Sequence, residues 1–229
     1  MGIPGVSGNA PCKRPPRRAR FTRIRLGRPW CEALELDNGR LLVMRRIEPR
    51  DAPVLRRSFG YLTPEEIRFR FLHPINELTP DYARSLSHID RNRAFALVIV
   101  EALPPEQALI GAVARATIDD TGARAEFAIV VGREISGFGL GTLLMRRLIE
   151  WCRKKRLDTI YGVVMIENER MLALARSLGF RVALEPDNPG TARIWLPLRA
   201  AGRDEASNEH NQGGKDMPDS APDRFLYRR

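Results

Sequence analysis

Residues 126–153 read Glu-Phe-Ala-Ile-Val-Val-Gly-Arg-Glu-Ile-Ser-Gly-Phe-Gly-Leu-Gly-Thr-Leu-Leu-Met-Arg-Arg-Leu-Ile-Glu-Trp-Cys-Arg. Residues 127–131 are apolar and predict a buried strand, and a helical pattern begins after a turn in which Gly137, Gly139 and Gly141 alternate. Glycine lets backbone N–H groups approach a ligand without a Cβ in the way. The first N–H groups of a helix lack internal partners and lie at the positive end of its dipole. The stretch therefore predicts an anion site at a strand–helix junction, suited to a phosphate.

The spacing of these glycines excludes two common phosphate motifs. In the dinucleotide fingerprint G-x-G-x-x-G, counted from Gly137, the third glycine position is Thr142, and Asp158 precedes the next strand instead of ending it. A Walker loop needs Gly-Lys-Ser/Thr at the start of the helix, which residues 141–143 do not provide. What remains is an alternating Gly-x-Gly-x-Gly turn between a strand and an amphipathic helix.

The rest of the chain predicts short strands and helices around this unit. A hairpin over residues 32–47 turns at Asp37-Asn38-Gly39, and Thr63 and Thr79, each followed by proline, open short helices. Further strands are predicted at residues 94–100, 109–118, 124–131, 159–165, 180–184 and 192–198, and further helices at 52–59, 141–155 and 168–178. The order β-β-α-α-α-β-β-β-α-β-α-β-β indicates an α/β (α+β) fold, with a mixed, mostly antiparallel sheet and helices on both faces.

The glycine turn in this setting resembles the central motif of the GNAT N-acetyltransferase superfamily. That motif, Arg/Gln-Gly-x-Gly-x-Gly/Ala at a strand–helix junction, cradles the pyrophosphate of acetyl-CoA. The resemblance spans residues 41–198 and extends to the acetyltransferase domain of the bacterial protein lysine acetyltransferases that modify acyl-CoA synthetases. The phrases that carry this narrower resemblance are residues 47–52 (Ile-Glu-Pro-Arg-Asp-Ala), residues 125–131 (Ala-Glu-Phe-Ala-Ile-Val-Val) and residues 168–180 (Asn-Glu-Arg-Met-Leu-Ala-Leu-Ala-Arg-Ser-Leu-Gly-Phe).

Charge is unevenly distributed along the 229 residues, which have a net charge of +10. Residues 1–31 hold eight basic residues and no acid, whereas 200–229 hold five bases and six acids. We expect a disordered basic arm at 1–31, a GNAT domain at 32–199 and a disordered tail at 200–229. The arm fits a solvated tail, a weak nucleic-acid or anionic-surface contact, or an Arg-rich targeting peptide, and nucleic acid is not the expected main partner.

Cysteine usage and hydropathy indicate a cytoplasmic protein without a membrane segment. Cys12, Cys31 and Cys152 share no metal-ligand spacing and cannot all pair, and Cys152 lies on the apolar side of the predicted helix, as a buried thiol would. No apolar run approaches the roughly 20 residues that a membrane helix needs. We therefore expect neither a metal site nor a membrane contact.

The resemblance implies where acetyl-CoA would bind as the acyl donor. Its pantetheine arm would run beside the strand of Val130, and backbone groups of Ile129 and Val131 would pair with its amides. The pyrophosphate would be held by Ser136, Gly137, Phe138, Gly139, Leu140, Gly141 and Thr142. Ser136 replaces the usual Arg, Gln or Lys but keeps its backbone N–H, and Arg133 could supply the missing charge. Asn168 would contact the donor through its amide, or would serve only as a helix N-cap.

Glu126 is the candidate general base because it begins the strand that would hold the donor, beside the expected position of the acetyl group. The alternative is an edge carboxylate that pairs with Arg115 or Arg124. Strict alternation puts Glu126 and Ile129 on opposite faces, and a bulge of the kind common in the family would change that. Many family members have a tyrosine that acts as general acid and protonates the departing thiolate. Ala175 stands at that position here.

Three functions remain open at this point. The first is an N-acetyltransferase that moves an acetyl group to a primary amine by direct attack in a ternary complex, with a protein lysine or a small-molecule amine as acceptor. The second is a CoA-binding regulatory module without catalysis, which the changes at Ser136 and Ala175 keep open. The third is a nucleic-acid-associated protein that uses the basic arm, whose binding would depend steeply on salt. The oligomeric state and the acyl-chain preference are not indicated by the sequence.

Overall fold

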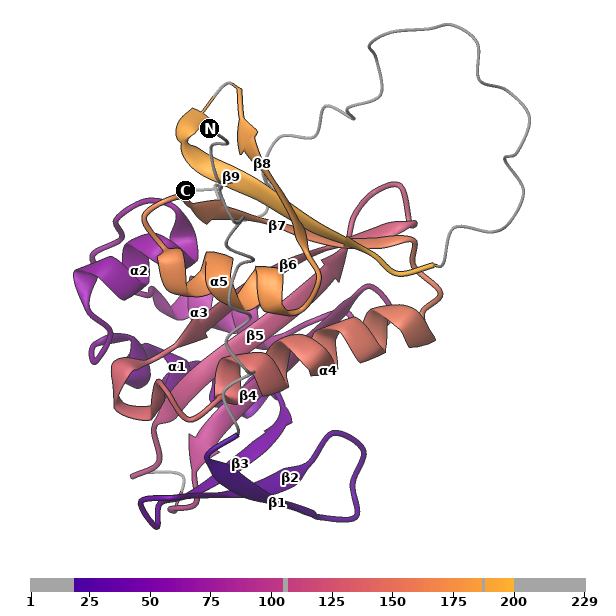
Figure 1. Cartoon of the computed structure of the whole chain (residues 1–229). Coiled ribbons are helices and arrows are strands. Elements are labelled where there is room, and N and C mark those ends of the chain that lie inside the picture. Colours follow the sequence, from indigo (N-terminus) through magenta and orange to yellow (C-terminus); the bar gives the residue numbers. More distant parts are fainter. Residues whose placement is uncertain (1–18, 105–106, 187, 200–229) are drawn as a thin grey trace, which may run out of the picture.

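The computed structural model describes residues 19–104, 107–186 and 188–199, in which nine strands form one sheet (Figure 1). The strands lie in the order β1-β2-β3-β4-β5-β6-β7-β9-β8. They are β1 (Phe21–Arg25), β2 (Glu32–Leu36), β3 (Leu41–Arg46), β4 (Ala94–Glu101), β5 (Ile110–Ile118), β6 (Arg124–Val131), β7 (Thr159–Met165), β8 (Arg181–Glu185) and β9 (Asn188–Pro197). Neighbouring strands are antiparallel except β6 and β7, which are parallel because a helix connects them.

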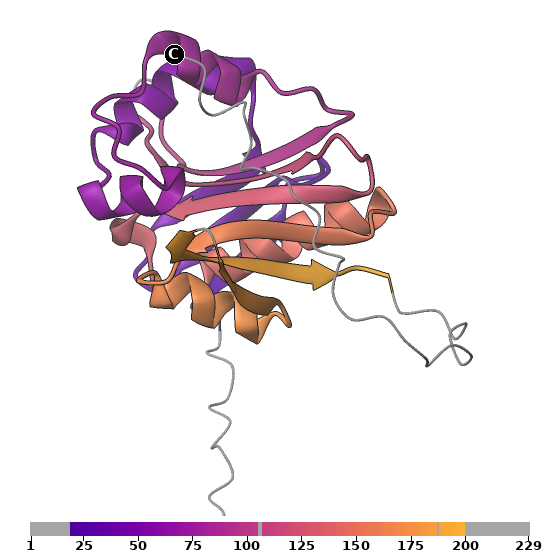
Figure 2. The same cartoon turned by 90° about the horizontal axis from the view of Figure 1, so that it is seen from above.

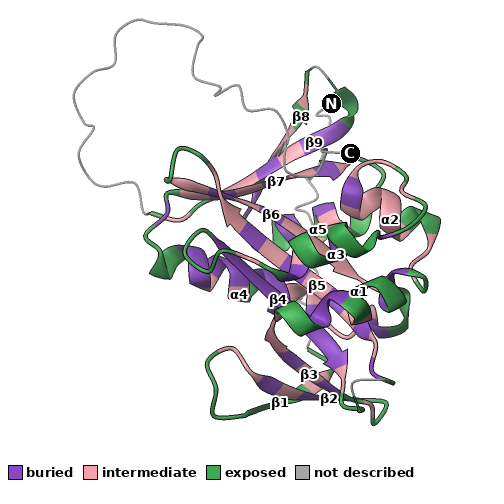
Figure 3. Cartoon of the chain, turned by 180° about the vertical axis from the view of Figure 1, so that it is seen from behind, coloured by how far each residue is buried: buried purple, intermediate pink, exposed green. Residues whose placement is uncertain are grey.

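Helices cover both faces of the sheet (Figure 2). They are α1 (Ala52–Phe59), α2 (Pro64–Phe71), α3 (Pro80–Ser87), α4 (Leu140–Lys154) and α5 (Glu169–Ser177), with short 3-10 turns at Pro49–Asp51 and Arg133–Ile135. Alternate residues of β4 enter two cores, Phe95 on the face of α4 and α5, and Val98 on the face of α1, α2 and α3. Strand β4 is therefore buried on both faces, whereas alternate residues of β5 and β6 are only partly buried (Figure 3). This confirms the predicted mixed sheet with helices on both faces.

Local capping signals predicted the helices correctly. At the start of α2, the side chain of Thr63 accepts a hydrogen bond from the Glu66 N–H (3.1 Å), and Glu66 accepts one from the Thr63 N–H (2.7 Å). In α4, the predicted apolar stripe is buried, and Leu148 and Cys152 have no exposed surface. Burial raises the pKa of the Cys152 thiol to about 12, so this cysteine is a structural apolar residue as predicted.

The predicted boundary of the basic arm is wrong. Residues 1–31 were expected to be disordered, but Phe21–Arg25 form β1, which pairs antiparallel with β2. Phe21 is partly buried and the other four residues are exposed, so no apolar alternation marks the strand in the sequence. Backbone pairing to β2, the packing of Phe21 on the core and an ion pair of Arg23 with Glu32 (3.6 Å) hold it in the sheet. Residues 1–18 and 200–229, which include most of the predicted arm and the whole predicted tail, lie outside the described residues.

Several polar residues of the helical segment have structural roles. His88 ends α3, and Asp90 accepts a hydrogen bond from the Asn92 N–H (2.8 Å).

Across the described residues, no three His, Cys, Asp or Glu side chains gather so that they could hold a metal ion. The helices of the same part of the chain are all too short or too polar to cross a membrane.

Candidate active site

Strands β6 and β7 part after three paired residues. The pairs are Arg124↔Thr159, Ala125↔Ile160 and Glu126↔Tyr161. Beyond them β6 stays paired with β5 as far as Val131, and β7 stays paired with β9 as far as Met165. Within the described chain, the edge of residues 127–131 that faces β7 therefore has no strand partner, and Glu126 lies at the vertex where the two strands part.

Glycine at position 162 allows the close approach of β6 and β7 at this vertex. A Cβ placed on Gly162 would lie 2.9 Å from Cε1 of Phe127 and 3.1 Å from the Phe127 carbonyl oxygen. The Phe127 ring is itself held edge-on against Phe180, with ring centroids 5.6 Å apart. A side chain at position 162 would therefore push against both a packed ring and a backbone atom.

We expect Gly162→Val to lower the free energy of unfolding by about 1–3 kcal/mol, because overpacking at a closely packed site forces neighbouring atoms to move. Urea denaturation of the variant and the wild type would measure the change from the midpoints at equal slope. Gly60→Ala is the matched control, because a Cβ at position 60 would meet its nearest atom, the Arg57 carbonyl oxygen, at 3.6 Å. If Gly162→Val had the same free energy of unfolding as the wild type, Phe127 would be able to move aside without loss of stability, and this expectation would be wrong.

The glycine turn lies where α4 begins, beyond the open end of this edge. Gly137 and Gly139 adopt left-handed backbone angles, with φ of +86° and +90°, which other residues adopt at a cost. A Cβ on Gly141 would lie 3.4 Å from Leu174 and 3.8 Å from Val131, so the first turn of α4 packs closely on β6 and α5. No side chain caps the N-terminus of α4. No described side chain therefore caps the first N–H groups of α4, those of Leu140, Gly141 and Thr142. They lie beyond the open edge of β6, where a phosphate could bind.

Two expectations about phosphate binding change in the structure. The Ser136 N–H, expected to remain for the ligand, donates to the carbonyl of Arg133 (3.1 Å). The Arg133 guanidinium, expected to supply positive charge, is exposed and pairs with Glu134 (3.2 Å). Arg20, which the sequence placed in the arm, lies beside the turn instead: its N–H donates to the Phe138 carbonyl (3.1 Å) and its guanidinium lies 5.0 Å from the Phe138 ring centroid. Like Arg133, Arg20 has an acidic partner, because its guanidinium pairs with Asp37 (3.2 Å).

Asn168 is a helix cap, as one of its two predicted roles required. Its side-chain oxygen accepts a hydrogen bond from the Met171 N–H (3.0 Å) at the start of α5. The preceding residue, Glu167, forms an ion pair with Arg68 of α2. This ion pair connects α2, which packs near β6, with the loop that follows β7.

Glu126 and Ile129 point to opposite faces of the sheet. The register of β5 and β6 runs without a shift from Ala112↔Val131 to Ile118↔Ala125, so the bulge considered from the family resemblance is not present in this pair. Ile129 and Val131 pack on the core of α4 and α5. Glu126 and Val130 lie four residues apart on β6, so their side chains point to the same face of the sheet. Val130 lines a pocket under α1, α2 and α3. The carboxylate therefore lies on the α1–α3 face of the sheet, while the glycine turn opens beside α4 and α5.

Tyr161 is a neighbour of Glu126 that the sequence did not single out. It lies on β7, directly opposite Glu126 of β6. Burial, together with the negative charges of Glu126 and Asp119, raises the pKa of Tyr161 to about 12. Arg124 stacks on the Tyr161 ring (5.7 Å) and pairs with Asp119 (2.9 Å), so its charge already has an acidic partner. The position at which the family resemblance implies a tyrosine is occupied by Ala175, which is fully buried.

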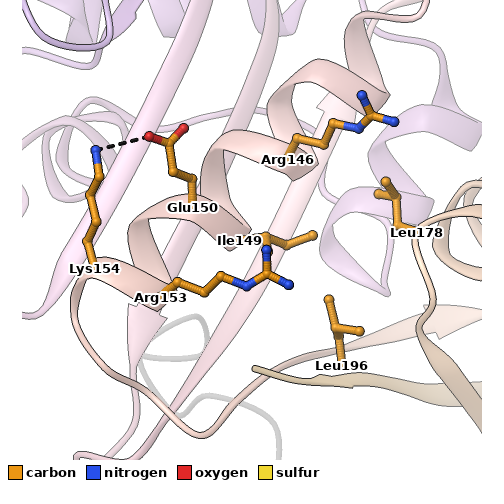
Figure 4. A pocket seen from close by; sticks show the side chains of 7 residues that line it. All are labelled: Arg146, Ile149, Glu150, Arg153, Lys154, Leu178 and Leu196. Carbon is orange, nitrogen blue, oxygen red and sulfur yellow. Dashed lines mark ion pairs between the residues drawn. The ribbon is translucent and has the colours of Figure 1, made fainter. Parts of the chain in front are cut away.

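A larger pocket, of about 540 Å³, lies on α4 away from the vertex (Figure 4). It is lined by Arg146, Ile149, Glu150, Arg153, Lys154, Leu178 and Leu196. Arg146 and Arg153 extend over an apolar floor, and Lys154 pairs with Glu150 (3.0 Å). None of the vertex residues lines this pocket, so it is separate from the site built around Glu126.

Comparison with known proteins gives consistent matches. The family model described as the acetyltransferase (GNAT) domain matches residues 41–181. The chain is 30% identical over 162 residues to Acetyltransferase PA5475 of Pseudomonas aeruginosa, which covers 71% of this chain and 86% of that protein. The GNAT domain of S. lividans PAT superposes with a TM-score of 0.65 at 20% identity, over 74% of this chain and 97% of that one. Spermidine N-acetyltransferase from Vibrio cholerae, in complex with CoA and spermine, gives 0.54 at 21% identity, over 69% and 95%.

The two solved structures support the fold, and the family model together with the Pseudomonas relative supports membership. The family match covers more than half of the chain and includes β6, the glycine turn, α4 and α5. The resemblance inferred from the sequence is thereby confirmed. The chain belongs to the GNAT acetyltransferase superfamily, whose members are acetyl-CoA-dependent N-acetyltransferases.

Proposed function

We propose that this protein transfers the acetyl group of acetyl-CoA to a primary amine by direct attack in a ternary complex, with Glu126 as the general base. The observation that carries the proposal is the open edge of β6, which has Glu126 at its closed end and the glycine turn beyond its open end. Such an edge can accept an extended ligand as an added strand. Glu126 lies on the α1–α3 face, so the amine would approach from that side.

The donor would be held mainly by backbone groups. Ile129 and Val131 offer N–H and C=O groups on the open edge to the amides of the pantetheine arm, and the turn at Gly137, Gly139 and Gly141 offers N–H groups to the pyrophosphate. Arg20 lies beside this turn, where it pairs with Asp37 and could turn toward a bound phosphate. An N–H of the open edge would also polarise the thioester carbonyl as negative charge develops on its oxygen.

Acetyl transfer at the vertex depends more on a base that deprotonates the amine than on an acid that protonates the CoA thiolate. A lysine-like amine has a pKa near 10.4, so only about one in a thousand molecules is neutral near pH 7.4. Glu126 accepts the proton, the amine nitrogen bonds to the carbonyl carbon, and the carbon–sulfur bond breaks to release the CoA thiolate. A thiol has a pKa of about 8.5, well below that of Tyr161 at about 12, so Tyr161 would hydrogen-bond to the departing group without losing its proton.

The donor half of the proposal is tested by thermal-shift titration with acetyl-CoA, propionyl-CoA and free CoA, with NAD and ATP as controls. A ligand at a hundred times its Kd that binds only the folded protein adds about 2.7 kcal/mol of stability. Release of the CoA thiol in the presence of an amine panel then tests transfer. A lysine-containing peptide and small amines are both included, because the resemblance to protein lysine acetyltransferases and the small-amine alternative are both open. Binding without turnover of any amine would favour the regulatory CoA-binding module.

A further inference from the structure

Arg70 on α2 has a buried guanidinium nitrogen without a hydrogen-bond partner. Among the described residues, nothing accepts a hydrogen bond from its Nη1, which is buried. The guanidinium lies 4.8 Å from the ring centroid of the adjacent Phe71. Leaving a charged donor buried and unsatisfied is costly, so such a group usually has a ligand or a structural partner.

Helix α2 holds Arg70 in a fixed position against β6. The capping box of Thr63 and Glu66 fixes the start of the helix. The other Glu66 carboxylate oxygen accepts a hydrogen bond from the Arg133 N–H (2.7 Å), just beyond the end of β6. The Glu66 carboxylate thus connects the start of α2 with the end of β6, the strand that carries Glu126. This connection fixes the position of Arg70 relative to β6.

Arg70 borders an apolar pocket of about 60 Å³ between the sheet and helices α1, α2 and α3. Its apolar lining includes Leu55, Phe59, Phe71, Leu78, Ile110 and Val130. Of the described lining residues, only Arg70 and Arg115 are charged, and both are positive. Because a cavity of roughly 10–15 Å³ can hold one water, this space suits a few waters or the small end group of a ligand.

The second arginine and the base lie next to each other on the sheet. Arg115 of β5 is directly opposite Ala128, and Thr117, two residues further along, is directly opposite Glu126. Arg115 is oriented by a hydrogen bond from its Nε to the Thr117 hydroxyl (3.2 Å). Side chains two residues apart on a strand point to the same face, so Arg115 and Glu126 share the α1–α3 face.

The surroundings of Arg70 disfavour its charged form. Burial, together with the positive charge of Arg115, lowers the pKa of Arg70 to about 10, although the charges of Tyr82 and Glu126 act in the opposite direction. Glu126 is therefore near enough to act on Arg70 but does not compensate for its burial. An added anion between Arg70 and Arg115 would stabilise both guanidinium groups.

We propose that Arg70 and Arg115 bind a carboxylate of the acceptor, so that the acceptor is a small amino acid-like molecule whose amine reaches Glu126. This inference rests on the proposed transfer to an amine. Guanidinium groups pair well with planar carboxylates, and the apolar walls favour an acceptor with an apolar side chain. A polyamine, which carries positive charge along its length, would be repelled by the two arginines.

The first test compares acceptors that differ only in the carboxylate. Thiol release from acetyl-CoA is measured with leucine, methionine and phenylalanine, with the corresponding amino acid amides, and with spermidine and a lysine-containing peptide. We expect the free amino acids to exceed their amides by at least tenfold in kcat/KM. Amides, spermidine or peptide turned over as well as the amino acids would overturn this inference while leaving the proposed function intact.

The second test uses Arg70→Met, which removes the charge but keeps an apolar side chain of similar length. The control is Arg84→Met on α3, where the arginine is exposed and pairs with Asp81. We expect Arg70→Met to raise KM for the amino acids at least tenfold and to bring the acid-to-amide ratio close to one. Affinity for acetyl-CoA should stay unchanged and thermal stability should not fall, because the variant removes a buried unsatisfied donor, and Arg84→Met should behave as wild type. An unchanged acid-to-amide ratio in Arg70→Met would contradict the assignment.

Complete absence of turnover would still leave a test of this site. In protein saturated with CoA, titration with N-acetyl-leucine, which has the carboxylate but no free amine, should raise the melting temperature of the wild type and not that of Arg70→Met. Equal shifts in the two proteins would reject the carboxylate site. A shift confined to the wild type without any turnover would support the site and reject the proposed transfer, so the two failures can be distinguished.

Discussion

Glu126→Gln is expected to lower kcat by about 10²–10⁴-fold, the contribution typical of a positioned general base. The amide keeps the size of the carboxylate but cannot accept the proton of the attacking amine. Glu126 lies at the vertex where β6 and β7 part, on the face of the sheet opposite to Ile129. Because the donor would be held by backbone groups of β6 and the glycine turn, acetyl-CoA affinity should change by less than about threefold.

The measurement is steady-state thiol release with the best acceptor, together with thermal-shift titration of acetyl-CoA. Glu35→Gln makes the same chemical change at an exposed position of β2 and should retain full activity. Retention of wild-type kcat by Glu126→Gln would remove Glu126 from the mechanism. Loss of acetyl-CoA binding in the same variant would instead show that the carboxylate supports the shape of the site.

Gly137→Ala is expected to weaken acetyl-CoA binding at least tenfold, or about 1.4 kcal/mol. The added Cβ meets no atom of the described residues within 4 Å, so it projects away from them beside the turn, where the pyrophosphate would lie. Alanine must also adopt the φ of +86°, at a cost of about 1–2 kcal/mol in stability. The variant should therefore remain folded but bind the donor poorly.

Gly122→Ala provides a matched control for Gly137→Ala. Gly122 also has positive φ, +72°, and a Cβ there also meets no atom within 4 Å, but it lies in the turn between β5 and β6, at the other end of β6 from the glycine turn. Both variants should lose similar stability in urea, and only Gly137→Ala should lose the thermal shift with acetyl-CoA. Equal loss of binding in the two variants would mean that backbone strain, and not access to the turn, is responsible.

Features with local causes could be predicted from the sequence. The capping box of Thr63 and Glu66, the turn at Asp37-Asn38-Gly39 and the apolar stripe of α4 depend on residues three or four positions apart. The alternating glycines likewise predicted a strand–turn–helix unit for an anion, and two of them have the positive φ that glycine permits. These local signals also carried the GNAT resemblance, which the family model confirms.

Features that depend on distant partners could not be predicted in this way. Strand β1 has almost no apolar side chains facing a core, and its backbone pairing to β2 cannot be read from its own residues, which carry no alternating pattern. The bond from the Ser136 N–H to the Arg133 carbonyl, and the position of Arg20 beside Phe138, follow from how the turn folds back and what packs on it.

The sequence by itself determined the fold class, the glycine turn and Glu126 as the acid at the start of β6, because each is written in neighbouring residues. The tertiary structure alone decided that β6 and β7 part after Glu126, where Gly162 closes on Phe127. It also decided that the Nη1 of Arg70 is buried beside a pocket that Arg115 lines as well, and that Tyr161 is opposite Glu126. In sequence, Arg70 stands in an Arg-Phe-Arg-Phe run that could equally be solvated, and only the packing of α2 against the sheet removes this nitrogen from water.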